Sequence, residues 1–524
     1  MLTAPLSPRL HAVIRIALAV VGGLSLLYAF PPYGQWWIAP FSVAANIVAV
    51  RGTRWWVAFL LGLVQGLAFF IPLLKFVEVA GTDGWFILAA WCSLWIGLMS
   101  IVVMLVQRLP LWPLWIACAW ILQEMLRSRV PFGGFSWGRL AFGASDAPVT
   151  SLASLGGAPL LTFLLALMGA MLVWVVLRAC NRDFVRAAIG VIGAAMIVVI
   201  GIVLPLPTAA EDGSPYIAVI QGNTADIGMS AFDQARAVLD NHVKETKRLA
   251  EQVAAGEAQQ PQLVLWPENA SDMDPYANPS VYTEISSAAQ AIGVPIIIGA
   301  VIGYPGDPTR VANAGIVWDP VTGPGEFYIK RHPVPFGEFV PFRDILAKLI
   351  SRFERVPRDF GAGTWPGVLT AGGVTIGDVI CYEVAYDDIV HDAIIGGGQV
   401  LVVQTNNATY MGTHQPDQQW AITRLRAVEH GRSTLVAATT GISGWITPDG
   451  AVVQELPLMQ SDHFVGAIPL RDTLTLSDRL SYWPEYLASL AALIAAIWAV
   501  VTRRRLRRDA ALDSRENPEE EPIA

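Results

Sequence analysis

Long apolar runs separated by short polar breaks fill residues 1–206, and one further apolar run lies near the C-terminus. Runs of this length are typical of helices that cross a bilayer whose hydrocarbon core is about 30 Å thick. The first run resembles a signal peptide, but prolines follow it instead of a small-residue cleavage site, so we interpret it as an anchor. The second run is short, as a tilted or partly re-entrant helix would be. We expect about eight spans, near residues 11–30, 36–50, 55–74, 85–106, 111–127, 155–178, 187–206 and 484–502.

A block of ordinary soluble composition lies between the last two runs. Its strand-like apolar runs are 216–221, 263–266, 294–301, 314–318, 327–330, 374–381, 400–404 and 435–438, and its helix-like stretches are 229–254, 280–292 and 415–430. Strands flanked by helices indicate an α/β sandwich. We therefore divide the chain into membrane helices (1–206), a soluble domain (207–482), a C-terminal helix with a basic flank (483–508) and a disordered acidic tail (509–524).

Composition supports a membrane protein, and charge predicts its orientation. Hydrophobic residues make up 54% of the chain and charged residues only 15%, whereas a soluble domain has about a quarter of charged residues. Basic loops stay in the cytoplasm. Eight spans place most of the basic loop residues on the same side of the membrane. These are Arg51, Arg54, Arg108, Arg178, Arg182, Arg186 and the run 503–508. We expect both termini in the cytoplasm and residues 207–482 outside.

Cysteine is rare, and only one cysteine lies in the soluble block. Cys92, Cys118 and Cys180 lie in apolar or membrane-edge sequence, where cysteine commonly acts as a small hydrophobe. For the remaining one, Cys381, composition alone favours an inert thiol over a reactive one. No metal-ligand spacing, GxGxxG motif or P-loop motif occurs. We expect no metal, no other cofactor and no nucleic-acid partner.

Charged side chains occur in the same setting as Cys381. Glu268 and Lys330 each end a strand-like run, and Glu338 follows Phe336-Gly337. A thiol that transfers acyl groups needs a base, positive charge at the oxyanion and a group that moves protons. Taken singly, Glu268 is better explained as a helix cap, Lys330 as a surface lysine and Glu338 as a turn residue. Their occurrence together with a solitary cysteine favours an active site.

One outer loop does not follow the charge rule. Arg127, Arg129 and Arg139 surround an aromatic segment that contains Trp137. Arginine pairs with phosphate, and aromatic residues gather at headgroup depth. Arg127, Arg139 and Trp137 are therefore candidates for a cationic ledge that binds lipid phosphate. An ordinary interfacial loop explains the pattern equally well.

Longer motifs connect these residues to a known family. The soluble block contains Pro267-Glu268, Lys330-Arg331-His332-Pro333-Val334-Pro335-Phe336-Gly337-Glu338 and Ile380-Cys381-Tyr382-Glu383. It also contains Gln221-Gly222-Asn223 and Arg424-x-Arg426-Ala427-x-Glu429-x-Gly431-Arg432, and the membrane part contains Glu124-x-x-Arg127 before Phe135-Ser136-Trp137. These motifs resemble the carbon–nitrogen hydrolase (nitrilase) superfamily. Over nearly the whole chain they are similar to its apolipoprotein N-acyltransferase family of the bacterial plasma (inner) membrane.

The resemblance implies an αββα nitrilase-like sandwich with a Glu–Lys–Cys triad. By this resemblance Glu268 is the general base, Lys330 stabilises the thiolate and the oxyanion, and Cys381 is the nucleophile. The expected supporting residues are Glu338, as a second essential carboxylate, and Tyr382 and Glu383 at the pocket.

The resemblance also implies a reaction. A phospholipid acyl donor would acylate Cys381, and the diacylglyceryl-cysteine of an apolipoprotein would then accept the chain on its α-amine by ping-pong kinetics. A membrane-tethered amidase or nitrilase acting on small amides is the alternative with the same chemistry. A transporter or sensor is a further alternative, although the spans contain few ionisable groups and no internal repeat.

Two segments depart from the family pattern. Many relatives have an Asn-Asp-x-Trp-Phe-Gly loop where this chain has Asn406-Asn407-Ala408-Thr409-Tyr410-Met411-Gly412. Relatives also have a tryptophan after the Gln-Gly-Asn turn, where this chain has Met229 and Phe232. We expect both segments to shape access for the acyl chain or the acceptor.

Overall fold

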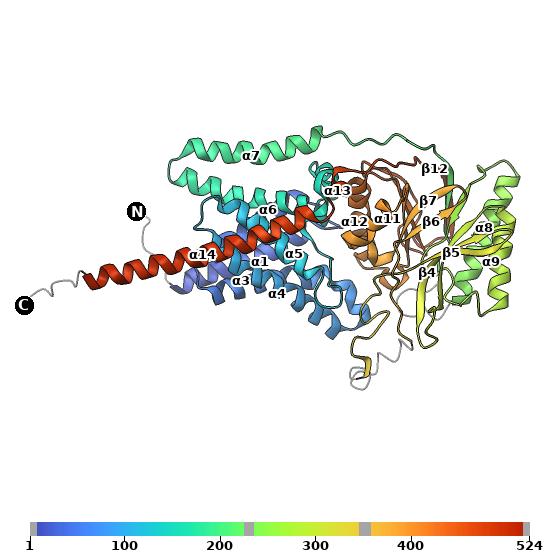
Figure 1. The fold of residues 1–524 in the computed structure, drawn as a ribbon, viewed down its shortest axis with the longest axis horizontal. Coiled ribbons are helices and arrows are strands. Elements are labelled where there is room, and N and C mark those ends of the chain that lie inside the picture. Colours follow the sequence, from blue (N-terminus) through green and yellow to red (C-terminus); the bar gives the residue numbers. More distant parts are fainter. Residues whose placement is uncertain (1–7, 225–234, 345–357, 517–524) are drawn as a thin grey trace, which may run out of the picture.

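A helical bundle and a two-sheet sandwich lie end to end in the computed structural model (Figure 1), which describes residues 8–224, 235–344 and 358–516. Met229 and Phe232 lie outside the described residues. The helices of the bundle are α1 (Pro8–Leu27), α2 (Ala39–Val50), α3 (Trp55–Leu73), α4 (Thr82–Val106), α5 (Trp112–Arg127), α6 (Ala153–Cys180), α7 (Phe184–Val203) and most of α14 (Trp483–Glu516).

Each predicted span corresponds to a helix of this bundle. Six of the helices in the described ranges are long and apolar enough to cross a membrane, namely α1, α3, α4, α6, α7 and α14. The helices α2 and α5 have only 12 and 16 residues. The membrane bundle is therefore confirmed, with six spans that meet the length criterion and two shorter helices packed among them.

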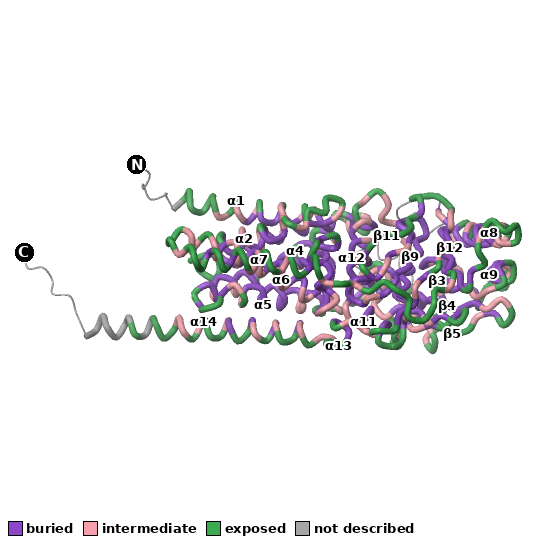
Figure 2. The backbone as a smooth tube through the Cα atoms, turned by 90° about the horizontal axis from the view of Figure 1, so that it is seen from above, coloured by how far each residue is buried: buried purple, intermediate pink, exposed green. Residues whose placement is uncertain are grey.

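The helix α14 continues beyond the predicted basic flank. It runs through Asp509 to Glu516, inside the segment 509–524 that we expected to be disordered. Arginine, alanine and leucine dominate residues 503–512, and these residues favour helix. Figure 2 shows that α1 begins and α14 ends at the end of the bundle away from the sandwich. Exposed residues follow the outer sides of α1 and α14 along the bundle.

The sandwich consists of two six-stranded mixed sheets. The strands of the first sheet, in spatial order, are β12 (Asp462–Ala467), β1 (Tyr216–Gln221), β2 (Leu263–Leu265), β3 (Ile296–Gly303), β4 (Val311–Asp319) and β5 (Gly323–Ile329). Those of the second are β11 (Val452–Glu455), β10 (Gly444–Ile446), β9 (Thr434–Ala438), β8 (Val400–Thr405), β7 (Val374–Ile380) and β6 (Val368–Ala371). The central pairs β1–β2–β3 and β7–β8–β9 are parallel. The first and last strands of the domain, β1 and β12, pair antiparallel from Tyr216–Ala467 to Gln221–Asp462.

Helices cover the outer face of each sheet, so the predicted αββα sandwich is confirmed. In Figure 1, α8 (Ala235–Ala254) and α9 (Pro279–Ile292) lie at the far end of the molecule. The helices α11 (Asp387–Ile395) and α12 (Gln415–His430) lie between the second sheet and the bundle. Strands covered on both faces read as continuous apolar runs, which is why β1, β8 and β9 are buried along almost their whole length.

The hydrophobic core continues from the bundle into the sandwich. One apolar cluster contains Phe142 of the bundle side together with Ile422 and Leu425 of α12. A second cluster fills the space between the two sheets and includes Cys381. The soluble domain is therefore packed against the membrane helices through α11 and α12, and Cys381 belongs to the inter-sheet core.

Candidate active site

Cys381 lies where strand β7 ends. The strand stops at Ile380, and Cys381 begins a short 3-10 helix, η7 (Cys381–Ala385). Its φ is +55°, in the left-handed region, which costs a residue with a side chain about 1–2 kcal/mol. A strained turn from a buried strand into a helix is a known way to present a nucleophile at the edge of a sheet. The backbone here is therefore suited to a reactive residue.

Lys330 lies in a buried cluster of polar groups next to this turn. Its Nζ donates to Oε1 of Glu268 at 3.0 Å and to Oε1 of Glu338 at 2.9 Å. The side-chain amide of Asn313, on β4, donates to the same two oxygens at 2.7 and 3.2 Å. We call Lys330, Glu268, Glu338 and Asn313 the Lys330 cluster. Burial alone lowers the pKa of Lys330, but the two carboxylates raise it well above its usual value, so the side chain is an ammonium.

Burial and the Lys330 cluster together determine the ionisation of Cys381. Burial raises the pKa of the thiol to about 12, and the charge of Glu268 adds to this effect. Lys330 and a hydrogen bond with Thr405 act in the opposite direction, but they do not outweigh burial. Lys330 thus lowers the pKa of Cys381, as we expected, but not enough to produce a thiolate. The resting thiol keeps its proton, so a base must remove it during attack.

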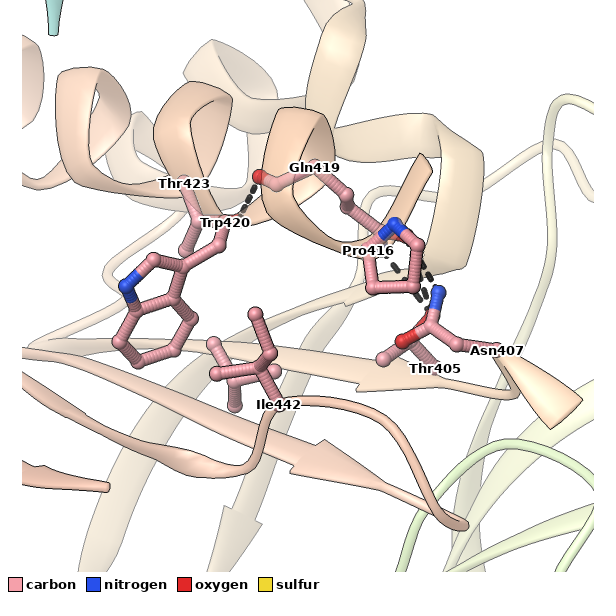
Figure 3. Close-up of a pocket in the computed structure, with 8 residues that line it drawn as sticks. Thr405, Asn407, Pro416, Gln419, Trp420, Thr423 and Ile442 are labelled. Atoms are coloured by element: carbon pink, nitrogen blue, oxygen red, sulfur yellow. Dashed lines mark hydrogen bonds between the residues drawn. The ribbon is translucent and has the colours of Figure 1, made fainter. Parts of the chain in front are cut away.

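Glu268 also contacts the loop that departs from the family pattern. It follows β2, and its Oε2 accepts a hydrogen bond from the backbone N–H of Asn406 at 2.9 Å. The next residue, Asn407, donates to Gln419 of α12 at 2.9 Å, and Gln419 donates to Thr405 at 3.0 Å. Figure 3 shows these side chains around a small cavity of about 10 Å³. The loop 406–412 is therefore fixed to both Glu268 and α12.

Glu383 fixes the position of Lys330 relative to Cys381. It is buried and accepts a hydrogen bond from the Tyr328 hydroxyl at 2.9 Å. It also accepts from three backbone N–H groups, those of Ile380 at 2.8 Å, Arg331 at 2.7 Å and His332 at 3.0 Å. These donors flank the thiol on one side and the lysine on the other. Glu383 therefore joins the end of β5 to the end of β7.

Tyr382 connects the site to the membrane helices through aromatic contacts. Its ring stacks on Phe135 and Trp137 of the bundle side, with centroids 5.7 and 5.9 Å apart. Phe76, in the 3-10 helix η2 (Lys75–Ala80), contacts both Trp137 and Tyr410 at 5.7 Å. Burial raises the pKa of the Tyr410 hydroxyl, and the neighbouring Cys381 adds to this rise. An aromatic surface therefore runs from the helices to the surroundings of Cys381.

The expected lipid-phosphate ledge is not an exposed surface. The guanidinium of Arg127 is buried and donates to the carbonyl oxygens of Phe135 at 2.8 Å and Trp137 at 2.5 Å. The indole N–H of Trp137 donates to Gln418 of α12 at 2.7 Å. Both bonds of Arg127 come from Nη1 and fix the loop that follows α5, and Trp137 holds this loop against α12.

Arg139 belongs to a buried ionic network between the bundle and the sandwich. It pairs with Asp387 at 2.5 Å and Glu124 at 3.4 Å, and Arg426 pairs with Asp387 at 2.7 Å and Glu429 at 2.5 Å. We call Glu124, Arg139, Asp387, Arg426 and Glu429 the junction cluster. Glu429 also accepts from the backbone N–H of Ala158 at 3.1 Å, at a break in α6 where Gly157 has a φ of +71°. A side chain at Gly157 would collide with this carboxylate.

One group of possible metal ligands occurs among the residues that the structure describes. Glu245, Asp462 and His463 lie close together beside β12. Arg248 pairs with Glu245 at 2.9 Å and with Asp462 at 3.1 Å, and Gln252 and His463 are hydrogen-bonded at 2.9 Å. These contacts already occupy the ligand atoms, so the group is explained without an ion.

Two members of the site did not follow from the sequence. Asn313 bridges the two carboxylates, and the backbone N–H of Asn406 binds the base candidate. Asn313 could have been found, because it is a polar residue within an apolar run on strand β4. The Asn406 contact depends on a backbone group, which carries no signal in the sequence.

The fold and the site define a membrane-bound protein of the carbon–nitrogen hydrolase class. The carbon–nitrogen hydrolase family model matches residues 216–475, and the model of the apolipoprotein N-acyltransferase N-terminal domain matches residues 22–171. An amidase structure from Nesterenkonia sp. aligns with a TM-score of 0.39 and 18% identity over 54% of this chain and 99% of the amidase.

Relatives with the same two-part organisation identify the family. The chain is 38% identical over 482 residues to the apolipoprotein N-acyltransferase of Mycolicibacterium smegmatis, covering 88% of this chain and 81% of that protein. It is 27% identical to the enzyme of the same name from Methylococcus capsulatus, over 94% of this chain and 96% of that protein. The chain belongs to the apolipoprotein N-acyltransferase family, and it is an acyltransferase. The resemblance seen in the sequence motifs is confirmed, and the transporter alternative is excluded.

Proposed function

We propose that this enzyme moves a fatty acyl chain from a membrane phospholipid to the α-amino group of the N-terminal diacylglyceryl-cysteine of apolipoproteins, through a thioester on Cys381. The name of the relatives supports an apolipoprotein acceptor. One observation carries the chemical part of the proposal. A thiol, a base candidate and an ammonium meet at a sheet edge, and aromatic residues join that edge to membrane helices. A lipid bound among the helices would thus be next to the nucleophile.

In the first half-reaction, Sγ of Cys381 attacks the ester carbonyl carbon of the phospholipid. Glu268 accepts the thiol proton as the carbon–sulfur bond forms. This transfer is needed because the resting thiol has a high pKa and keeps its proton. The Lys330 ammonium stabilises the negative charge on the carbonyl oxygen. Glu268 then gives the proton to the leaving glycerol oxygen. The products are a lysophospholipid and the acyl-Cys381 thioester.

In the second half-reaction, the neutral α-amine of the acceptor attacks the thioester carbonyl. Glu268 takes a proton from the attacking nitrogen, and Lys330 again stabilises the oxyanion. Collapse breaks the carbon–sulfur bond, returns a proton to sulfur and leaves an amide on the acceptor. One base and one oxyanion site serve both steps, so we expect ping-pong kinetics.

Water has to be kept from the thioester for transfer to compete with hydrolysis. Cys381 is 8% exposed, and Tyr382, Trp137 and Tyr410 cover its surroundings with aromatic surface. This supports transfer over hydrolysis of small amides. We further propose that Glu338 and Asn313 hold Lys330 and Glu268 in place, and that Glu383 and Tyr382 position the turn at Cys381.

The orientation belongs to the same proposal. We place the enzyme in the bacterial plasma (inner) membrane with the sandwich on the extracytoplasmic side and both termini in the cytoplasm. The basic run 503–508 near the end of α14 supports this orientation, because such runs remain on the cytoplasmic side. The active site would then face the outer leaflet, where both lipid substrates are available.

A labelling experiment tests the nucleophile. Purified enzyme incubated with acyl-labelled phospholipid should acquire a hydroxylamine-sensitive label, and Cys381→Ala should lose it. Cys180→Ala is the matched control, because Cys180 is an exposed cysteine away from the site and its removal should leave the label intact. Labelling that persists in Cys381→Ala would overturn the proposal.

A further inference from the structure

An acid and an amide lie side by side in the apolar space between the two sheets. Asp378 is on β7, shortly before Cys381, and Gln404 is on the neighbouring strand β8. The register pairs Ile380 with Gln404, and residues two apart in a strand share a face, so both polar side chains point the same way. Ile380 and Val402, which share this face, belong to the core between the sheets. Both polar side chains are fully buried there.

The glycine at position 315 leaves the space that these two side chains occupy. Gly315 is on β4, in the opposite sheet. A Cβ atom at this position would collide with Oδ2 of Asp378 and would lie 2.7 Å from Oε1 of Gln404. Neither carboxyl oxygen of Asp378 has a hydrogen-bond partner among the described residues, and Oε1 of Gln404 has none either. A carboxylate and an amide oxygen are both acceptors, so they repel each other at such a point unless one of them carries a proton.

The surroundings of Asp378 favour its neutral form. Burial raises the pKa of this carboxyl well above its usual value, and the charge of Glu383 raises it further. No cation in the described part of the chain offsets these two effects. Tyr328, which also interacts with Asp378, uses its hydroxyl for a hydrogen bond to Glu383. An unpaired buried carboxylate is far more costly than the neutral acid, so Asp378 keeps a proton that it can donate.

Gln404 connects this acid to the segment that carries the base candidate. Its side-chain amide nitrogen donates to the carbonyl oxygen of Trp266 at 2.6 Å. Trp266 follows β2 and precedes Pro267 and Glu268, and the proline ring restricts the backbone between them. The bond crosses from the second sheet to the first. The orientation of the Gln404 amide therefore affects where the chain leaves β2 and where Glu268 lies.

We propose that Asp378, as a neutral acid, donates its proton to Oε1 of Gln404 and that this pair sets the position of Glu268 relative to Cys381. With Oε1 turned toward Asp378, the amide nitrogen of Gln404 faces Trp266. Asp378 and Gln404 are positioning residues, because they act on Glu268 through the backbone at Trp266. This inference rests on the proposed function, since it concerns the placement of the base in that reaction.

The proton on Asp378 can be observed directly. Enzyme with isotopically labelled aspartate side chains should show the infrared carbonyl band of a protonated aspartic acid at about pH 9, far above the usual range for aspartate. Asp272, with a pKa of about 7, is ionised under these conditions. Asp378→Asn should remove the band. Absence of the band from wild type, or its persistence in this variant, would overturn the inference.

The rate at which phospholipid labels Cys381 in folded protein tests the positioning role. Asp378→Leu removes the proton donor, and Gln404→Met removes the bond to Trp266. Each should slow labelling about 10- to 100-fold, as expected for a misplaced catalytic group. Asp378→Asn keeps a donor for Oε1 and should restore the rate to within about threefold of wild type. Slowing in Asp378→Asn as large as in Asp378→Leu would contradict a role for the donated proton.

Val402→Ala is the matched control, because Val402 is on β8 and faces the same core with an apolar side chain. It should lower the thermal midpoint and leave the labelling rate of folded protein unchanged. Equal slowing in Val402→Ala and Asp378→Leu would assign the effect to core packing and overturn the inference. Wild-type rates in Asp378→Leu and Gln404→Met would also overturn it, while leaving the proposed function intact. Absence of labelling in wild type would instead overturn the proposed function.

Discussion

The junction cluster and the Lys330 cluster are both buried groups of charges, and they differ in the cations that pair with their carboxylates. In the junction cluster, Arg426 donates to Asp387, Glu429 and the carbonyl oxygens of Val384 and Ala385. In the Lys330 cluster, one ammonium serves two carboxylates, Glu268 and Glu338, beside a protonated thiol.

The difference appears in the ionisation of the acids. Burial raises the pKa of Asp387, but Arg139 and Arg426 more than reverse this and hold it well below its usual value. Near the active site the balance is opposite. Burial raises the pKa of Asp272 to about 7, and the charge of Glu268 adds to the rise. In the junction cluster two guanidinium groups hold Asp387 charged, whereas in the Lys330 cluster one ammonium is shared by two carboxylates, and the nearby Asp272 has a pKa at which it can take up a proton.

Removing the base should have the largest effect. Glu268→Gln keeps the size of the side chain but cannot accept the thiol proton, so we expect acylation of Cys381 to slow about 10²- to 10⁴-fold. The amide nitrogen must also face one of the donors that Glu268 now accepts from, so we expect a lower thermal midpoint and compare rates for folded protein only. Glu251→Gln, an exposed change on α8, is the control. A rate within tenfold of wild type would remove Glu268 from the proposed role.

Removing a cation from the junction cluster should act on stability instead. Arg426→Met leaves Glu429 without its arginine partner and Asp387 with only one, and breaking a buried pair in this way costs about 3–5 kcal/mol. We expect a large drop in the thermal midpoint, while protein that remains folded still forms the Cys381 adduct.

The neighbouring Arg424 provides the control. It pairs with the exposed Asp146 at the surface, so Arg424→Met should cost less than about 1 kcal/mol. Similar losses in the two variants would mean that the junction cluster adds nothing beyond an ordinary surface pair.

A further effect should be seen in the pH dependence of stability. Asp272 has its pKa raised from 3.8 to about 7 in the folded protein. Between these values the folded state holds a proton that the unfolded state has lost, so stability falls as pH rises from 4 to 7. Asp272→Asn removes this loss. The variant should match wild type below pH 4 and have the higher thermal midpoint above pH 7. A constant difference across this range would contradict the assignment.

Apolar patterns in the sequence were sufficient to predict the membrane helices and the central strands of the sandwich. The runs 216–221, 263–266 and 400–404 became β1, β2 and β8, and the motif around Cys381 placed this cysteine at a strand end. The peripheral elements β6, α11 and β12 were not predicted. Their residues are more mixed in polarity, and tertiary packing decides their conformation.

The lipid ledge illustrates what a local pattern cannot determine. Arginine and tryptophan in an outer loop have the composition of a membrane interface. Whether Arg139 faces lipid depends on Asp387 and Glu485, which are hundreds of residues away in the chain. The same reasoning applies to Asn313, whose two carboxylate partners are distant in sequence.

The pairing of β1 with β12 has a consequence for biogenesis. The edge of the first sheet is completed only when Asp462–Ala467 has been synthesised, more than two hundred residues after Tyr216–Gln221. Contacts of such long range form late and slow folding. β2 can pair with one edge of β1 early, but the other edge of β1 would stay open until β12 follows. The first sheet would therefore gain its last strand only shortly before α14 is synthesised and joins the helical bundle.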